Sequence, residues 1–251
     1  MTASGTTSGT ELGTELGLRL RARTFELHGS DDDLAIAQLR AEHPMPEVAG
    51  QAGHVLEAIA RAIRPDVTIT TDVGQHQMWV AQHYTFNDPT EHLSSGGLGT
   101  MGYGLPAAIG AKIARPEHTV VCVSGDGSIM MNVQELATIK RYDIDVKILL
   151  LDNSALGLVR QWQEIFFDGN YSEVHLSDNP DFAGVARAFG LQAKSIKESD
   201  QVDEALEWLL NTEGAAMLHV SIDSMENVWP LVPPGKPNHK MMKSMPKNLR
   251  Y

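Results

Sequence analysis

Apolar positions between residues 51 and 233 recur at two spacings, one typical of buried strands and the other of amphipathic helices. Short runs of apolar and β-branched residues predict strands at 67–73, 118–125, 145–152, 192–197 and 215–223. Helical spacing predicts helices at 54–65, 128–142, 180–190 and 200–211, and the glycine-rich stretch 95–114 is expected to run into a helix of small residues. Strands that alternate with such helices predict an α/β fold, a parallel sheet with helices on both faces.

The two ends of the chain lack this regular pattern. Residues 1–17 are rich in Gly, Ser, Thr and Glu, and we expect a flexible lead because this composition buries little surface. Residues 18–46 predict at most a small appendage or linker. One principal domain is therefore expected at 47–233, followed by a C-terminal arm at 234–251.

Composition narrows the classes of function. Of the 251 residues, 42% are hydrophobic and 21% are charged, which is ordinary for a globular protein. The net charge of −12 argues against nucleic acid or an anionic membrane as the partner. The apolar stretches have the length of strands, so no membrane span is expected, and the N-terminus lacks the pattern of a signal peptide. The single cysteine, Cys122, excludes an internal disulfide framework and favours a reducing, cytoplasmic compartment.

Polar and glycine-rich turns follow three of the predicted strands. These turns read TDVGQH at 71–76, SGDGS at 124–128 and LDNSALG at 151–157. In a parallel sheet the ligand binds beyond the carboxyl ends of the strands, so the three turns are candidates for one site.

Two of these turns carry side chains that suit a magnesium ion beside a phosphate. Asp126 supplies a hard oxygen ligand, and Ser128 opens a predicted helix whose free N–H groups favour an anion. Asn153 supplies a neutral amide oxygen, and neighbouring parallel strands bring their ends within roughly 5 to 10 Å of each other. Each turn alone has an ordinary explanation, since Asp-Gly is a common structural turn and Asn153 can cap a helix or form an Asx-turn.

The GDG sequence followed by a pair ending in Asn resembles the thiamine diphosphate and Mg²⁺ motif of thiamine-dependent enzymes. The stretches TTDVGQHQMW, SSGGLGTMGYGLPAAIGA, SGDGSIMMNVQELAT, ALGLVRQWQEIFF and VPPGKPNHKM are similar to the C-terminal, diphosphate-binding domain of acetohydroxyacid synthase (acetolactate synthase) catalytic subunits. The resemblance covers about residues 50–242. Asp152 departs from the motif, which usually has Asn there; we expect little effect, because the second position of the pair supplies the metal ligand.

The resemblance implies a role for each matching position. Mg²⁺ would be bound by Asp126, the Asn153 side chain and the Ala155 carbonyl. The residues that would contact the thiamine diphosphate are Gly74, Gln75, His76, Gly99, Met101, Asp126, Gly127, Ser128, Asn153, Leu158 and Val159. Trp162 would line the substrate pocket and favour 2-oxobutyrate over pyruvate as the acceptor.

Three of these residues also have a plain structural interpretation. Met101 either bends the cofactor into a V shape or fills the core. His76 is either a contact for the diphosphate or a loop histidine. Trp162 is either a substrate wall or a residue of the core or of an interface.

The resemblance also implies parts that these residues do not supply. In the family, the cofactor is activated by a glutamate from the pyrimidine-binding domain of a neighbouring subunit, and a further domain binds FAD. Glu47 lies in a proline-bounded linker and is not assigned to that role, so no catalytic residue is assigned in this chain. We expect a separate pyrimidine-binding chain in a hetero-oligomer, and FAD only through another domain or partner.

Three functions are therefore compatible with the sequence. The first is the diphosphate-binding half of an acetohydroxyacid-synthase-like enzyme that acts on small 2-oxoacids and is nearly inactive without its partner. The second is a subunit of a split 2-oxoacid decarboxylase or another carboligase. The third is a non-catalytic cofactor-binding protein or a truncated fragment.

Overall fold

The computed structural model describes Val55, Ala58 and residues 67–84, 86, 88–197 and 201–245. All of these residues lie within one compact unit, residues 46–251. The predictions for residues 1–46 lie outside the described residues. So does most of the predicted helix at 54–65, of which only Val55 and Ala58 are described, both of them helical.

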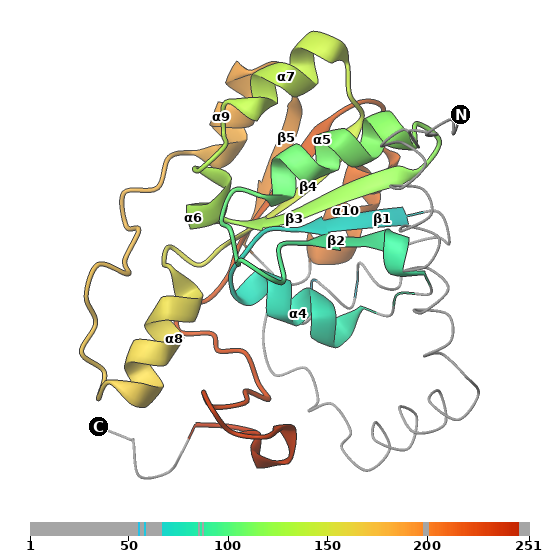
Figure 1. Ribbon diagram of the computed structural model, residues 1–251. Coiled ribbons are helices and arrows are strands. Elements are labelled where there is room, and N and C mark those ends of the chain that lie inside the picture. Colours follow the sequence, from blue (N-terminus) through green and yellow to red (C-terminus); the bar gives the residue numbers. More distant parts are fainter. Residues whose placement is uncertain are drawn as a thin grey trace, which may run out of the picture. The chain divides into compact units, whose positions relative to one another are not determined.

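The described part of the chain is built on a six-stranded parallel sheet with the order β2-β1-β3-β4-β6-β5 (Figure 1). The strands are β1 (Val67–Thr71), β2 (His92–Ser94), β3 (Thr119–Gly125), β4 (Val146–Asp152), β5 (Gln192–Ile196) and β6 (Ala216–Ser221). The five predicted strands are confirmed, and the short edge strand β2 is an addition. Strands β3 and β4 pair directly, with Gly125 opposite Leu151, so the turns that carry Asp126 and Asn153 leave the sheet side by side.

Helices cover both faces of the sheet, as expected (Figure 1). The helices are α4 (Gln75–His83), α5 (Gly104–Ala114), α6 (Asp126–Ile129), α7 (Glu135–Tyr142), α8 (Gly157–Phe166), α9 (Phe182–Ala188) and α10 (Val202–Asn211), with 3₁₀ turns η1 (Pro89–Glu91) and η3 (Asn238–Lys240). Helices α4 and α10 contribute Trp79 and Leu206 to one hydrophobic core. Helices α5, α7 and α9 pack against the opposite face of the sheet and contribute to the second hydrophobic core. Helix α8 lies at the carboxyl ends of the strands.

Side chains of the central strands alternate between these two cores. Val121 and Val123 point into the core with α4 and α10, whereas Val120 and Cys122 point into the opposite core. Strands buried on both faces explain the continuous apolar runs in the sequence. Burial raises the pKa of the Cys122 thiol to about 12, so this cysteine behaves as a small hydrophobic residue.

The predicted single helix at 128–142 is wrong, because two helices with a tight turn between them occupy this stretch. Helix α6 begins at Asp126 and ends at Ile129, and α7 begins at Glu135. The turn is held by i to i+3 hydrogen bonds, such as Met131 N to Ser128 O at 3.1 Å. The Asn132 side chain donates to the Gly102 carbonyl at 2.7 Å, which fixes the turn against the glycine-rich loop.

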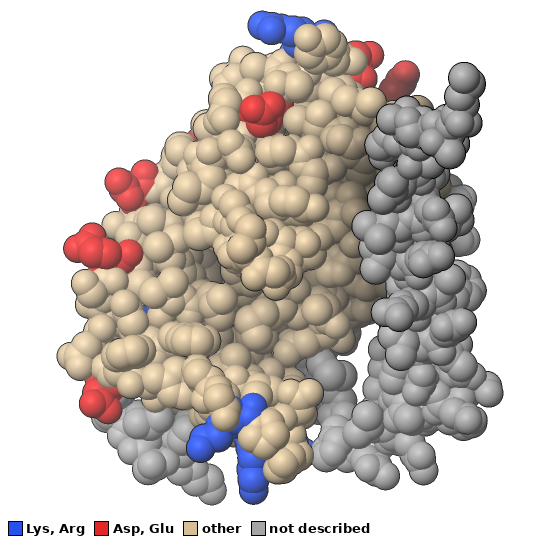
Figure 2. All heavy atoms as spheres, viewed as in Figure 1, with Lys and Arg blue, Asp and Glu red and all other residues tan. Residues whose placement is uncertain are grey.

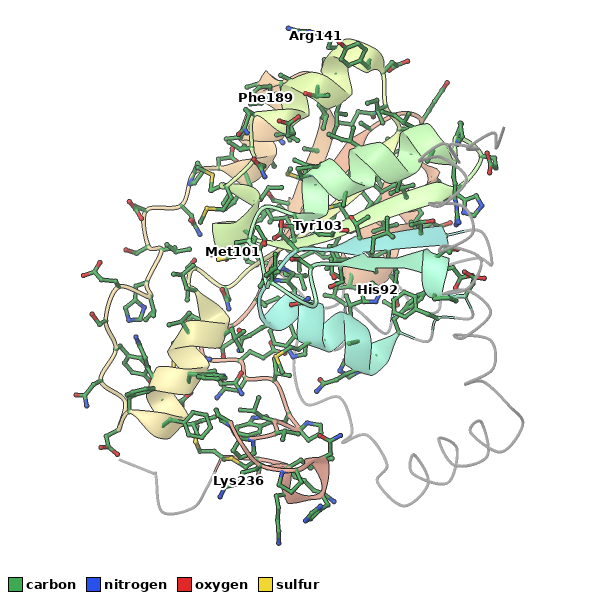
Figure 3. All side chains as sticks on the ribbon, in the orientation of Figure 1. His92, Met101, Tyr103, Arg141, Phe189 and Lys236 are labelled. Carbon is green, nitrogen blue, oxygen red and sulfur yellow. The ribbon has the colours of Figure 1, made fainter. Side chains whose placement is uncertain are left out.

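The described part of the C-terminal arm is anchored to the domain. An antiparallel bridge joins Leu231 and Met242, whose amides donate to each other's carbonyls at 2.9 and 2.7 Å. The loop between them carries exposed Lys236 and Lys240, and Lys and Arg side chains gather at this end of the view (Figures 2 and 3). Among the described helices, none is both long and apolar enough to cross a bilayer.

Candidate functional site

One cavity of about 170 Å³ lies at the carboxyl ends of β1, β3 and β4. Its wall includes every residue that the sequence predicted to bind the cofactor or the metal ion: Gly74, Gln75, His76, Gly99, Met101, Asp126, Gly127, Ser128, Asn153, Ala155, Leu158 and Val159. Figure 3 shows Met101 at the strand ends, near α6. The topology explains this convergence, because three neighbouring parallel strands deliver their turns to one edge.

Oxygen atoms from two turns converge in this cavity. The Ala155 N–H lies 3.2 Å from the Asp126 Oδ2 and 3.2 Å from the Asn153 Oδ1, so both oxygens approach the same amide. A carboxylate, an amide oxygen and the nearby Ala155 carbonyl form the kind of donor set that Mg²⁺ accepts. In the described part of the chain there is no group of three His, Cys, Asp or Glu side chains that could hold a metal. The oxygens of Asp126, Asn153 and Ala155, called the clamp below, would leave the rest of a Mg²⁺ coordination shell to water or to the oxygens of a ligand.

Two residues beside the clamp were not predicted as site residues from the sequence. Asn179, in the loop before α9, donates its amide to the Asp126 Oδ2 at 2.9 Å and to the Asp152 Oδ1 at 3.2 Å. His219 on β6 places its Nε2 2.9 Å from the Asp152 Oδ2. Asp152 is thus a second carboxylate that shares the Asn179 amide with Asp126 and also pairs with His219. No short-range sequence signal identifies Asn179, because it lies far from both carboxylates along the chain.

The two carboxylates differ in their pKa. Burial, together with the nearby negative charge of Asp152, raises the pKa of Asp126 to about 7, although the Asn179 amide acts in the opposite direction. Burial also acts to raise the pKa of Asp152, but hydrogen bonds from His219 and the Ser154 N–H outweigh it and leave that pKa below its usual value. A buried carboxylate with a raised pKa is well placed to exchange its proton for a metal ion.

The His76 imidazole forms part of the cavity wall. Its ring lies beneath Gly74 and Gly125, where an added Cβ would approach ring atoms to 2.8 and 2.9 Å. A larger residue at either position would have to displace the buried imidazole. The Nε2 is buried and lacks a hydrogen-bond partner among the described residues. Burial lowers the pKa of His76 to about 4, so the ring is neutral at pH 7. An orphaned nitrogen in a cavity wall fits a bound polar ligand.

The carboxylate of Asp72 holds the glycine-rich loop in place, although the sequence did not mark it as a site residue. Its Oδ1 accepts from the Val73 N–H and the Gly102 N–H, both at 2.8 Å, and its Oδ2 accepts from the Gly104 N–H at 3.3 Å. Gly99 and Gly102 have φ angles of +62° and +89°, which other residues rarely adopt. This loop carries Met101 to the cavity.

The Gln75 side chain has internal partners. Its Nε2 donates to the Gln161 Oε1 at 3.0 Å and to the Glu226 carbonyl at 2.9 Å, and its Oε1 accepts from the Asn153 Nδ2 at 3.1 Å. Any contact of Gln75 with a bound anion is therefore left to its backbone N–H at the start of α4. The Ser128 hydroxyl is similarly engaged, because it donates to the Val73 carbonyl at 2.8 Å.

Trp162 does not line the first cavity but a second one on the outer side of α8. This cavity of about 740 Å³ also touches Leu158 and Val159, which therefore border both spaces. The indole is 39% exposed and meets the Phe166 ring edge-on at 5.8 Å. A core role for Trp162 is thereby excluded, whereas a substrate wall and an interface both remain compatible with its position.

The pKa shifts of Asp126 and His76 predict a compensated pH dependence of stability. The raised pKa of Asp126 makes the folded state gain stability as the pH falls from about 7 towards 4. The lowered pKa of His76 makes the folded state lose stability as the pH falls from 6.5 towards 4. With Asp126→Asn only the second effect remains, so acidification from pH 7 to 5 should cost the variant on the order of 2 kcal/mol more than the wild type. Urea unfolding at both pH values measures this difference, and equal losses would contradict it.

Comparison with known proteins gives a consistent result. Residues 72–220 match the family described as "Thiamine pyrophosphate enzyme, C-terminal TPP binding domain". The chain is 54% identical over 213 residues to the acetolactate synthase isozyme 2 large subunit of Escherichia coli (strain K12), which covers 83% of this chain and 39% of that protein. It is 48% identical over 167 residues to a probable acetolactate synthase large subunit of Methanocaldococcus jannaschii, covering 66% of this chain and 28% of that protein. The chain thus spans about two fifths or less of the length of these relatives.

Proposed function

Because the chain belongs to the thiamine pyrophosphate enzymes, as a C-terminal TPP-binding domain, we propose that it binds thiamine diphosphate and Mg²⁺ in the cavity at the carboxyl ends of β1, β3 and β4. The observation that carries this proposal is the convergence of the Asp126 and Asn153 oxygens beside one amide. The orphaned His76 Nε2 and the glycines that give it room support the same assignment.

Each group of residues has a distinct task in this proposal. Asp126, Asn153 and the Ala155 carbonyl would hold Mg²⁺ beside the diphosphate. The N–H groups at the starts of α4 and α6, with the glycines Gly74 and Gly127, lie against the diphosphate, and His76 adds its ring nitrogen. Met101 would support the cofactor, Gly99 would contact its aminopyrimidine, and Leu158 and Val159 would contact its thiazolium. When bound, thiamine diphosphate supplies the decarboxylation and carbon–carbon ligation chemistry.

We infer that the activity is that of an acetohydroxyacid synthase: pyruvate is decarboxylated and its two-carbon fragment is joined to a second 2-oxoacid. The similarity to two acetolactate synthase large subunits of Escherichia coli, at 54% and 44% identity, supports this activity. Trp162 forms an apolar wall for the acceptor, and such a wall rewards one extra methylene by about 1 to 3 kcal/mol. This is the basis for a preference for 2-oxobutyrate.

The proposal includes a pyrimidine-binding chain that supplies the activating glutamate. Apolar side chains exposed beside the glycine-rich loop support a covering partner: Leu98 is 93% exposed, and Met130 and Met131 are about half exposed. The face drawn in Figure 2 is largely free of charged side chains, as protein interfaces often are at their centre. The relatives are named large subunits, so a smaller subunit is a further candidate partner.

Mixing the chain with a pyrimidine-binding partner tests this function. With Mg²⁺, thiamine diphosphate and pyruvate, the mixture should form acetolactate, whereas the chain alone should be nearly inactive because the proposal assigns the activating carboxylate to the partner. A catalytic-subunit variant that lacks its own diphosphate clamp is a suitable donor of the pyrimidine-binding domain. Release of acetaldehyde would favour a decarboxylase, and cofactor binding without turnover would favour a non-catalytic protein.

A further inference from the structure

A fully buried glutamine on α8, Gln161, joins three parts of the site. Its Oε1 accepts from the Gln75 Nε2 and from the Val228 N–H, both at 3.0 Å, and its Nε2 donates to the Val228 carbonyl at 2.9 Å. None of its surface is exposed, so it cannot touch a substrate. All of its hydrogen-bonding groups are directed at other parts of the fold.

Gln75 continues this connection to the metal clamp. Its Oε1 accepts from the Asn153 Nδ2 at 3.1 Å, which directs the other atom of that amide, Oδ1, towards the Ala155 N–H. The amides of Gln161, Gln75 and Asn153 therefore form one buried chain. Rotating any of them would leave a buried polar group unpaired, which is unfavourable.

The same helix carries the apolar wall next to Gln161. Arg160, which is 1% exposed, donates its guanidinium to the Glu226 carbonyl at 3.0 Å and to the Glu164 carboxylate at 2.9 Å. Arg160 and Gln161 thus hold the buried face of α8 against residues 226–228, while Trp162 faces the second cavity. Trp162 directly follows Gln161 in the same helix, so a displacement of Gln161 is expected to move the indole as well.

We propose that Gln161 is a positioning residue that couples the cation clamp to the apolar wall on α8. Through Gln75 it holds the Asn153 oxygen at the metal position, and through the helix it holds Trp162 at the acceptor side. Binding of a cation at the clamp therefore changes the position of the Trp162 indole. This inference rests on the proposed binding of Mg²⁺ and thiamine diphosphate. It adds that the cofactor site and the position of Trp162, which would select the acceptor substrate, are structurally coupled.

The first test measures binding of thiamine diphosphate at saturating Mg²⁺ by isothermal titration calorimetry on the full chain. Gln161→Leu should weaken binding about tenfold, which equals about 1.4 kcal/mol or roughly one lost hydrogen bond. Gln161→Glu should remain within about threefold of wild type at pH 6.5, because a buried carboxyl retains its proton and can replace both amide functions. Gln192→Leu is the matched control, since it removes a hydrogen bond to the Glu213 carbonyl at the far edge strand β5 and should leave binding unchanged.

The second test follows the indole of Trp162 by ¹⁹F NMR of the chain labelled with 5-fluorotryptophan, with Trp162→Leu used to assign its resonance. Adding Mg²⁺ and thiamine diphosphate should shift this resonance in the wild type and in Gln161→Glu. In Gln161→Leu the shift should be lost at cofactor concentrations that saturate the site.

The outcomes separate the coupling from the proposed function. If the wild type binds the cofactor, and Gln161→Leu binds it equally well or leaves the Trp162 shift intact, the coupling is wrong and the cofactor assignment stands. If the wild type shows no Mg²⁺-dependent binding, the cofactor assignment fails and the coupling fails with it. Circular dichroism of Gln161→Leu shows whether weaker binding reflects loss of the fold, and the glutamate variant then decides the question.

Discussion

Asp126→Ala is expected to abolish Mg²⁺-dependent binding of thiamine diphosphate, weakening it by at least about a hundredfold, or about 2.8 kcal/mol. Asp126 is the only carboxylate of the proposed ligand set, and its Oδ2 lies 3.2 Å from the Ala155 N–H that the Asn153 oxygen also approaches. An amide oxygen and a backbone carbonyl alone carry no charge to balance the ion. Calorimetric titration of the variant with the cofactor at saturating Mg²⁺ measures the loss.

The same substitution should leave the fold intact. Removing a buried carboxylate whose pKa burial has raised to about 7 relieves a desolvation cost, so the metal-free variant should be at least as stable as the wild type at pH 8. Glu207→Ala on the exposed face of α10 is the control for truncating an acid, and it should bind the cofactor normally. Wild-type affinity in Asp126→Ala would overturn the central assignment.

The part of the candidate site formed by the turns after β3 and β4 was predictable from the sequence. The runs before Asp126 and Asn153 are mostly apolar, and such runs belong to strands buried on both faces. Parallel strands deliver their turns to one edge, so two turns far apart in the chain were expected to meet. The direct pairing of β3 with β4 confirms that expectation.

Long-range side-chain contacts were not predictable in the same way. Gln75 and Gln161 lie 86 positions apart, and Asp126 and Asn179 lie 53 positions apart, so no periodicity relates them. Helix α4 was missed because its sequence, QHQMWVAQH, does not separate polar from apolar residues into two faces. The break between α6 and α7 depends on Asn132 reaching the Gly102 carbonyl, a contact that exists only in the folded chain.

Gly157→Ala is the second substitution for which we expect a large effect. Gly157 is the first residue of α8, and an added Cβ would overlap the Gln75 Oε1 and the Asn153 Nδ2. These two atoms form the hydrogen bond that joins the start of α4 to the clamp. Both amides are buried, so neither can swing into solvent to make room. We therefore expect the Asn153 oxygen to leave the proposed metal position.

Helix propensity alone would predict the opposite result for Gly157→Ala. Alanine is more favourable than glycine within a helix by about 0.8 to 1 kcal/mol, so the substitution would be stabilising in the absence of the overlap. Gly110→Ala on α5 isolates this contribution, because an added Cβ there meets no atom within 4 Å. That control should raise the free energy of unfolding by roughly 0.5 to 1 kcal/mol and leave cofactor binding unchanged.

Calorimetry and urea unfolding of the two glycine variants together test the geometry of the clamp. Gly157→Ala should weaken Mg²⁺-dependent binding of thiamine diphosphate by about thirtyfold or more, since it displaces a ligand oxygen and breaks a buried hydrogen bond. Its unfolding should remain cooperative, because the overlap falls on side-chain amides and leaves the sheet untouched. Normal binding in Gly157→Ala would mean that the Gln75 and Asn153 amides move freely. In that case the clamp would not be held by the contacts that join α4, β4 and α8.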